Sequence, residues 1–171
     1  DPVWKLKQGL AFLLTSRGIP QIYYGTEIAM TGDKSNGGDS QMRADFPGGW
    51  AEDTATAFTA EGRTEFQNEC WNFASKLLNW RRTSKPVAEG KLIHYTPDNN
   101  TKCYVYARTD GKNTVLVILN GSDTLRALDM GRFSEVIGTN TRGVDAVTGQ
   151  VVDLTTPVLI EARGVYVLDL Q

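Results

Sequence analysis

Hydrophobic and polar positions follow a helical period at the start of the chain. Apolar side chains recur every three or four residues, the spacing that places them on one face of a helix. Asp1-Pro2 is a favourable start for such a helix, because Asp can cap it and Pro is tolerated at the first position. Gly18 is well placed to end it. The apolar positions are Val3, Leu6, Leu10, Leu13 and Leu14.

A short, continuously apolar run follows at residues 19–24. It is rich in β-branched and aromatic side chains, and Pro20, which has no amide donor, falls at its start. A continuous apolar run directly after a helix is typical of a strand in a parallel sheet that is buried on both faces. The pattern therefore predicts a buried strand at residues 19–24.

Residues 29–63 show no convincing period and contain many glycines and acids. Loops of this length inside compact domains are usually functional or disordered. Phe46, Trp50 and Phe58 argue against full disorder, because their apolar area would hold the loop in place.

The second predicted helix has a clear start and end. Thr64 and Gln67 have the spacing of a capping box, and positive charge near its end, at Arg81 and Arg82, suits the helix dipole. We expect Lys85-Pro86 to stop it. One apolar face is marked by Phe66, Cys70, Phe73, Leu77 and Trp80.

The pattern changes to β from Lys91 onward. Short runs with alternating polarity are separated by turn formers such as Asp98-Asn99-Asn100, Asp110-Gly111-Lys112-Asn113, Asn120-Gly121 and Thr148-Gly149. Short strands at close spacing predict an antiparallel sandwich. The domain boundary is expected near residues 86–90, which gives domains 1–88 and 89–171. The predicted strands are residues 91–95, 102–108, 114–120, 124–129, 142–145, 151–154, 157–160 and 165–170.

Composition excludes several classes of partner. Of 171 residues, 40% are hydrophobic and 22% charged, with a net charge of −2, so we expect no nucleic-acid partner. No apolar stretch approaches the ~18 residues that cross a bilayer, and residues 1–5 do not resemble a signal peptide. Cys70 and Cys103 are too few for a disulfide framework and are expected to be buried free thiols. His94 is interpreted as structural or exposed.

Asp39 and Arg43 lie four residues apart in the long loop. An acid and an Arg held together offer sugar hydroxyls both acceptors and a planar donor fork. The alternative is an ordinary surface ion pair, and spacing alone favours that alternative.

Other loop residues carry weaker signals. Glu27 follows the predicted strand, but glycosidic chemistry generally needs two facing carboxylates. Its possible partners, Asp33, Asp39 and Asp45, all lie in the loop, so we assign none of them to catalysis. The segment from Asp33 faintly resembles a calcium loop but has Ala44 where an EF-hand has its last acid. Among the aromatic residues, Tyr23, Tyr24, Phe46 and Trp50 either stack on sugars or belong to the core.

Several of these motifs resemble the alpha-amylase family of glycoside hydrolases. The run Gly18-Ile19-Pro20-Gln21-Ile22-Tyr23-Tyr24-Gly25-Thr26-Glu27 is similar to the family's segment around the eighth barrel strand. Asp39 and Arg43 resemble its Asp-x-x-Asn-Arg segment, with Met42 in place of the Asn. Phe46-Pro47-Gly48-Gly49-Trp50 resembles the neopullulanase and cyclomaltodextrinase-like branch. The helix through Trp80-Arg81-Arg82 resembles the eighth barrel helix.

The resemblance implies an α+β fragment: the last helix-strand-helix unit of a (β/α)8 barrel, followed by an antiparallel β-sandwich. It implies that the parent hydrolyses α-1,4-glucosidic bonds in starch-derived oligosaccharides or cyclodextrins. Asp39 and Arg43 would contact glucose, and Tyr24 and Trp50 are further candidates for substrate binding. For a bacterial parent, the expected location is periplasmic or cytoplasmic.

The family's catalytic groups are not among the motifs of this chain. The resemblance implies an Asp nucleophile, a Glu acid/base and a stabilising Asp on the fourth, fifth and seventh barrel strands, with an Asn-His-Asp motif upstream of Asp1. We therefore expect no catalytic residue, no metal and no cofactor here, and no activity from the chain alone. The alternative is a carbohydrate-binding or scaffold β-sandwich module. Because a barrel strand at residues 19–24 lacks neighbours here, we expect this segment to be rearranged or to self-associate.

Overall fold

The structure, a computed structural model, describes residues 3–97 and 99–171 apart from the side chain of Asn36. Contacts divide the chain into two compact units, Asp1–Pro20 with Lys76–Gln171, and Gln21–Ser75. The predicted helix start at Asp1-Pro2 and Asp98 of a predicted turn lie outside the described residues. The boundary expected between residues 88 and 89 differs from this division and stays a prediction about the domains of a longer protein.

Both long helices are present. The first, α1, spans Val3–Thr15, and Gly18 follows it with a φ of 120°. The second, α2, spans Glu65–Arg81. The predicted capping box at its start is confirmed, because the Gln67 amide donates to Thr64 Oγ1 (3.2 Å) and the Thr64 amide donates to Gln67 Oε1 (2.9 Å).

One expectation about local structure is wrong, and another is incomplete. Residues 19–24 form no strand, and the Ile19 side chain is 99% exposed. A strand needs neighbours for its backbone N–H and C=O groups, and the described residues supply none at this segment. Helix α2 ends at Arg81, before Lys85-Pro86, as expected. Pro86 then lies in the first turn of a further short helix, α3 (Lys85–Glu89), where its missing amide costs nothing.

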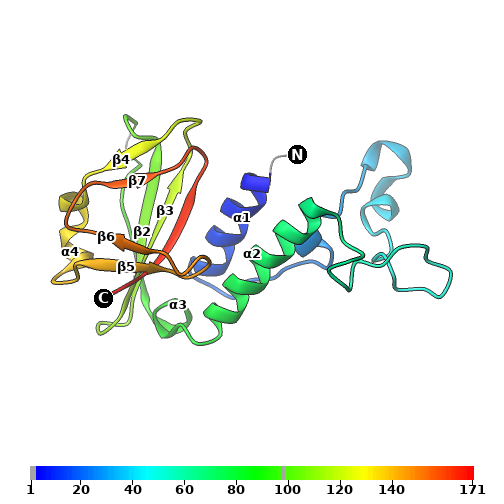
Figure 1. Cartoon of the computed structure of the whole chain (residues 1–171), viewed down its shortest axis with the longest axis horizontal. Helices are drawn as coiled ribbons and strands as arrows, with labels where there is room; N and C mark the ends of the chain where they lie inside the picture. The colour runs from blue at the N-terminus through cyan, green and yellow to red at the C-terminus, as the bar shows by residue number, and fades with distance from the viewer. Residues whose placement is uncertain (1–2, 98) are drawn as a thin grey trace. The chain divides into compact units, whose positions relative to one another are not determined.

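All eight predicted strands are present, with ends within two residues of those expected. Six form one antiparallel sheet in the order β1-β2-β3-β8-β5-β6, and two form the pair β4-β7 (Figure 1). Two short helical segments that the sequence did not predict, η4 (Met130–Phe133) and α4 (Ser134–Ile137), follow β4. The strands are β1 (Lys91–His94), β2 (Cys103–Thr109), β3 (Thr114–Asn120), β4 (Arg126–Leu128), β5 (Arg142–Asp145), β6 (Val151–Asp153), β7 (Val158–Ile160) and β8 (Val165–Leu170).

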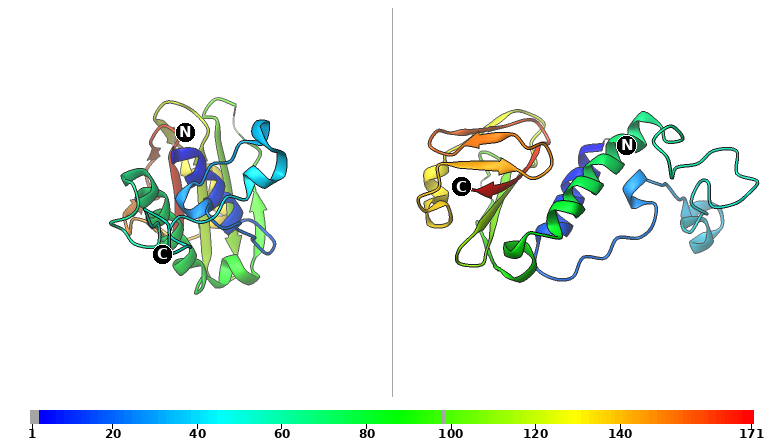
Figure 2. Two further views of the ribbon diagram at one scale, coloured as in Figure 1. Left: turned by 90° about the vertical axis from the view of Figure 1, so that its right-hand side faces the viewer. Right: turned by 60° about the horizontal axis from the view of Figure 1, so that its bottom comes forward.

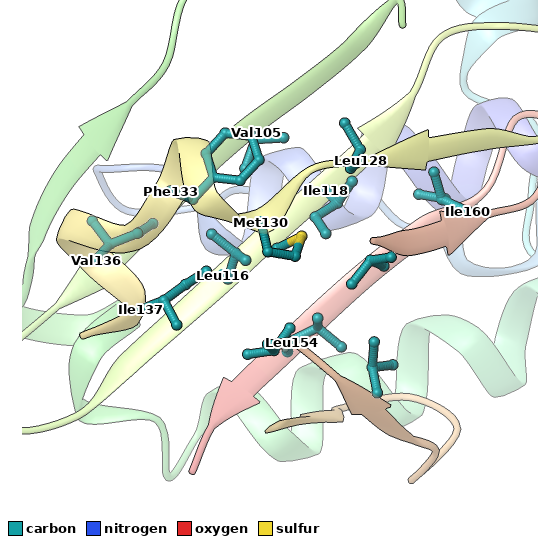
Figure 3. Close-up of a cluster of buried hydrophobic side chains, with 14 of the residues drawn as sticks. Val105, Leu116, Ile118, Leu128, Met130, Phe133, Val136, Ile137, Leu154 and Ile160 are labelled. Atoms are coloured by element: carbon teal, nitrogen blue, oxygen red, sulfur yellow. The ribbon is translucent and has the colours of Figure 1, made fainter. Parts of the chain in front are cut away.

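The main core lies between the six-stranded sheet and the elements that cover one of its faces. Figure 3 shows side chains of β2 and β3, such as Val105 and Ile118, beside Leu128 of β4, Ile160 of β7 and Phe133 of η4. All five are at most 4% exposed. Because the core joins both sheets, the predicted sandwich is confirmed.

The opposite face of β2 holds α1, which crosses the sheet in the left view of Figure 2. Side chains alternate along β2, and Tyr104, Tyr106 and Arg108 lie on this face. The hydroxyls of Thr15 and Tyr106 are 2.6 Å apart, and the Phe12 ring meets the Tyr106 ring edge to face. Burial raises the pKa of Tyr106 to about 12, against a lowering by its bond to Thr15.

Arg108 of β2 is only 2% exposed, and it forms hydrogen bonds both to the end of α1 and to Gly90, directly before β1. Its Nη1 donates to the carbonyls of Thr15 (2.9 Å) and Ser16 (2.8 Å), and its Nη2 donates to the carbonyl of Gly90 (2.9 Å). Arg81 Nη1 donates to the carbonyl of Leu14, the residue before Thr15. Burial lowers the pKa of Arg108, and the nearby positive charge of Arg81 lowers it further.

Replacement of Arg108 should destabilise the fold strongly. Arg108→Met removes three charged hydrogen bonds and leaves buried carbonyls without donors, so we expect a loss of about 2–4 kcal/mol in the free energy of unfolding. Urea denaturation followed by circular dichroism measures it. The control Arg142→Met, at an exposed position of β5, should change stability by less than ~0.5 kcal/mol. Equal losses in the two variants would contradict the role given to Arg108.

The raised pKa of Tyr106 predicts a loss of stability in alkali. Because folding raises this pKa from 10.0 to about 12, its contribution is fully present below about pH 10 and is lost as the pH rises through about 12. Tyr106→Phe should flatten the fall in the free energy of unfolding between about pH 9 and 12, measured by urea denaturation. The matched variant Tyr104→Phe removes a phenol from the same strand face. An equal flattening there would show that Tyr106 is not the group responsible.

Candidate functional site

The four substrate-binding candidates all lie in the unit Gln21–Ser75. Its regular structure before α2 consists of three short 3-10 helices, η1 (Thr26–Ile28), η2 (Lys34–Asn36) and η3 (Gly38–Met42). Glycines at positive φ begin two of them, Gly25 at 84° and Gly37 at 136°. The long loop is therefore folded into tight turns, and each candidate has a defined local setting.

Tyr24 is joined to the segment that carries Arg43. Its hydroxyl donates to the carbonyl of Ala44 (3.0 Å), and its ring lies 4.6 Å from the ring of Tyr23. Partial loss of hydration raises the pKa of Tyr24, and Tyr23 and the charge of Asp45 raise it further while Arg43 lowers it. Arg43 and Asp45 are thus close enough to act on the phenol electrostatically.

Tyr24 also borders a small cavity of about 150 Å³. Met42 and Ala44, the two neighbours of Arg43 in the chain, are part of the same wall. The volume is smaller than the ~300–1,000 Å³ of typical ligand sites, so this hollow on its own holds only part of a ligand. Its lining residues are Tyr23, Tyr24, Gly25, Thr26, Met30, Thr31, Gly32, Met42 and Ala44.

Asp39 has a different partner from the one that the spacing suggested. Its Oδ1 lies 2.8 Å from Nζ of Lys34, and the two side chains are 69% and 67% exposed. The described residues include no ion pair between Asp39 and Arg43. An exposed pair of this kind contributes little to stability, so the Asp39 carboxylate can exchange Lys34 for another polar group at small cost.

Trp50 lies in a turn that is held by hydrogen bonds to Asp53. The Asp53 carboxylate accepts hydrogen bonds from the amides of Gly48 (2.7 Å) and Trp50 (3.1 Å), and the ring centres of Phe46 and Phe58 lie 4.8 Å apart. The indole is 59% exposed. Among the described contacts, none joins Trp50 to Tyr24, Asp39 or Arg43.

The weaker signals find structural explanations. Asp33 accepts the amide and the hydroxyl of Ser35 (2.9 and 2.7 Å), which makes it the cap of η2. Within residues 3–97 and 99–171 no three His, Cys, Asp or Glu side chains cluster as a metal site would require. Cys70 and Cys103 are buried and not joined in a disulfide, as predicted, and His94 is exposed on β1. None of the helices in the described ranges is long and apolar enough to span a membrane.

Sequence reasoning missed the residues that hold this loop together. Arg63 donates from Nη1 to the carbonyl of Ala57 and from Nε to Asn68 Oδ1 (both 2.9 Å), and its guanidinium lies 4.4 Å from the ring centre of Trp71. A guanidinium stacked on an aromatic ring at a loop-helix junction is a strong anchor. The only sequence signal was an Arg directly before the capping box.

Comparisons with known proteins agree with the family resemblance of the sequence motifs. Residues 92–169 match the family described as the cyclo-malto-dextrinase C-terminal domain. The chain is 32% identical over 161 residues to a cyclomaltodextrin glucanotransferase of Niallia circulans, covering 88% of this chain and 20% of that protein. It is 31% identical over 153 residues to an alpha-amylase of the same organism, covering 85% of this chain and 25% of that protein.

Solved structures show the same fold. The crystal structure of an Anoxybacillus alpha-amylase gives a TM-score of 0.68 at 22% identity, over all of this chain and 33% of that one. An alpha-amylase from Geobacillus thermoleovorans, solved with acarbose, gives 0.71 at 18% identity, over all of this chain and 34% of that one. This chain thus spans only about a fifth to a quarter of the length of the first curated relatives. Residues 92–169 thus match the cyclo-malto-dextrinase C-terminal domain family, and the β-sandwich and the sequence similarities support a relationship to the alpha-amylase family.

Proposed function

We propose that this chain is part of an α-glucan-degrading enzyme that hydrolyses α-1,4-glucosidic bonds in starch-derived oligosaccharides or cyclodextrins. The similarity to a cyclomaltodextrin glucanotransferase and an alpha-amylase over most of the chain carries this proposal. Within it, residues 1–88 are the end of the catalytic barrel and residues 89–171 the β domain that follows. The motif from Phe46 to Trp50 supports the neopullulanase and cyclomaltodextrinase-like branch.

In this proposal Asp39, Arg43, Tyr24 and Trp50 contact the glucan, and the reacting carboxylates come from elsewhere in the parent. The bond from Tyr24 to the Ala44 carbonyl supports a shared site for Tyr24 and Arg43. The exposed, weakly held Asp39 and the exposed Trp50 are available to a substrate. By itself the β domain acts as a scaffold rather than a sugar-binding module, since the large exposed apolar side chains described in it, Leu125, Val151 and Leu159, include no aromatic ring.

The activity is tested by comparing the 171-residue chain with its full-length parent. The parent should degrade maltooligosaccharides or cyclodextrins, and the chain alone should show no turnover. In the parent, Asp39→Asn and Arg43→Met should each lower kcat/KM by roughly 10- to 100-fold, because each loses a charged hydrogen bond to sugar. The exposed variant Glu61→Gln is the control. Turnover that scales with the concentration of the purified chain would falsify the expected inactivity, and an unchanged kcat/KM in both variants would remove Asp39 and Arg43 from the site.

We also propose that the chain, separated from its parent, self-associates through residues 19–24. Ile19, Tyr23 and Tyr24 are 99%, 53% and 44% exposed, and the segment has no strand neighbour among the described residues. A second copy offers the same apolar side chains and unpaired backbone groups.

Sedimentation equilibrium should therefore show a dimer whose fraction rises with concentration, and Ile19→Asp should shift it toward the monomer. Val151→Asp, at another exposed apolar position (60% exposed), is the matched control and should leave the dimer in place. A single monomeric species at every concentration, or an equal effect of both variants, would contradict this interface.

A further inference from the structure

A second and larger cavity lies in the unit formed by Asp1–Pro20 and Lys76–Gln171, which does not contain the four substrate-binding candidates. It opens where the end of α2, the start of α3, the turn between β2 and β3, and the end of β8 meet. Its volume of about 450 Å³ falls within the range typical of small-molecule sites. Its lining includes Trp80, Thr83, Lys85, Asn113 and Asp169.

Trp80 and Asp169 form a fixed pair on this wall. The indole Nε1 donates to Asp169 Oδ2 at 2.6 Å, which holds the half-buried ring in one orientation. Burial raises the pKa of Asp169, and the bond from Trp80 lowers it in part. A carboxylate has about four acceptor positions, and within the described residues the indole is its one hydrogen-bond donor. The remaining acceptor positions are available to hydroxyl groups of a ligand.

The charges on the wall identify the class of ligand. It carries one acid, Asp169, and one base, Lys85, so the side chains favour neither an anion nor a cation. Together with the Thr83 hydroxyl and the Asn113 amide they form a set of neutral-ligand donors and acceptors around one aromatic ring. A pyranose has this character, with hydroxyls at its rim and an apolar face that stacks on an indole.

We propose that this cavity binds one glucose unit of an α-glucan, with Trp80 against the sugar face and Asp169 and Lys85 hydrogen-bonded to its hydroxyls. The choice of glucose rests on the proposed function, whereas the cavity and its chemistry do not.

Titration of the ¹⁵N-labelled chain with maltose, followed by NMR, tests the site. The Trp80 indole N–H resonance should shift and saturate with a Kd of about 1–10 mM, as expected for a small ligand with few contacts. Glucuronic acid, an anionic sugar, should bind no more tightly than maltose, because the wall carries both an acid and a base. Saturation of the Trp80 shift by maltose supports the site, and the absence of a shift up to about 50 mM maltose overturns it. Tighter binding of glucuronic acid than of maltose would overturn the assignment to neutral sugars.

Variants locate the binding. Asp169→Asn keeps an acceptor for the Trp80 indole and should raise the Kd for maltose roughly 10-fold. Lys85→Met should also raise the Kd for maltose. The matched control Asp153→Asn, at an exposed position of β6, should leave the Kd unchanged. Loss of the Trp80 shift in Asp153→Asn would overturn the proposal, because it would show that the shift does not depend on the cavity.

The failure of this proposal is distinguishable from that of the proposed function. A parent that degrades α-glucans while the Trp80 resonance of the chain stays fixed leaves the function intact and rejects only the cavity. If the parent has no activity on α-glucans but the chain shows a saturable Trp80 shift, the proposed function is rejected and the sugar site in the cavity is supported.

Discussion

The capping of the C-terminal end of α1 by two guanidinium groups is the contact on which the larger unit depends. A helix leaves its last carbonyls without partners, and positive charge there also suits the helix dipole. Arg81 bonds to the carbonyl of Leu14, and Arg108 bonds to those of Thr15 and Ser16. The same Arg108 holds the carbonyl of Gly90. One buried side chain of β2 therefore fixes where α1 ends and where the chain enters the sheet.

This arrangement explains why α1 groups with the sheet rather than with the loop that follows it. Gln8 adds a polar contact at the middle of the helix, where its Nε2 donates to the carbonyls of Asn120 (2.8 Å) and Arg163 (2.9 Å). The Arg163 guanidinium lies 4.8 Å from the ring centre of Trp4 nearer its start. Specific hydrogen bonds to backbone, rather than apolar area alone, thus set the register of α1 on the sheet.

Much of this fold follows from local sequence signals, and the failures have a common cause. The capping box at Thr64, the eight strands and the alternation in β2 depend on neighbouring residues, so the sequence predicts them well. The prediction of a strand at residues 19–24 is wrong. Apolar composition indicates that a segment needs burial, but it does not provide the neighbouring strands with which the backbone would pair. The role of Arg108 was equally invisible, since its partners lie about 20 to 90 residues away.

The candidate site shows the same limit. Residue types and a family resemblance selected Tyr24, Asp39, Arg43 and Trp50, and the structure gives each a defined setting. The Lys34 partner of Asp39 and the Ala44 acceptor of Tyr24 depend on the path of a loop with few repeating features. Glycines at positive φ determine that path, and no hydrophobic period reports it.

The wide spacing of the contacts made by α1 has a consequence for the order of folding. Thr15 meets Tyr106 across 91 positions, and Gln8 meets the Arg163 carbonyl across 155. Helix α1 therefore has no docking surface until nearly all of residues 3–171 have been made. The β-sandwich, whose strand contacts are more local, is positioned to form first and then to provide the surface on which α1 docks.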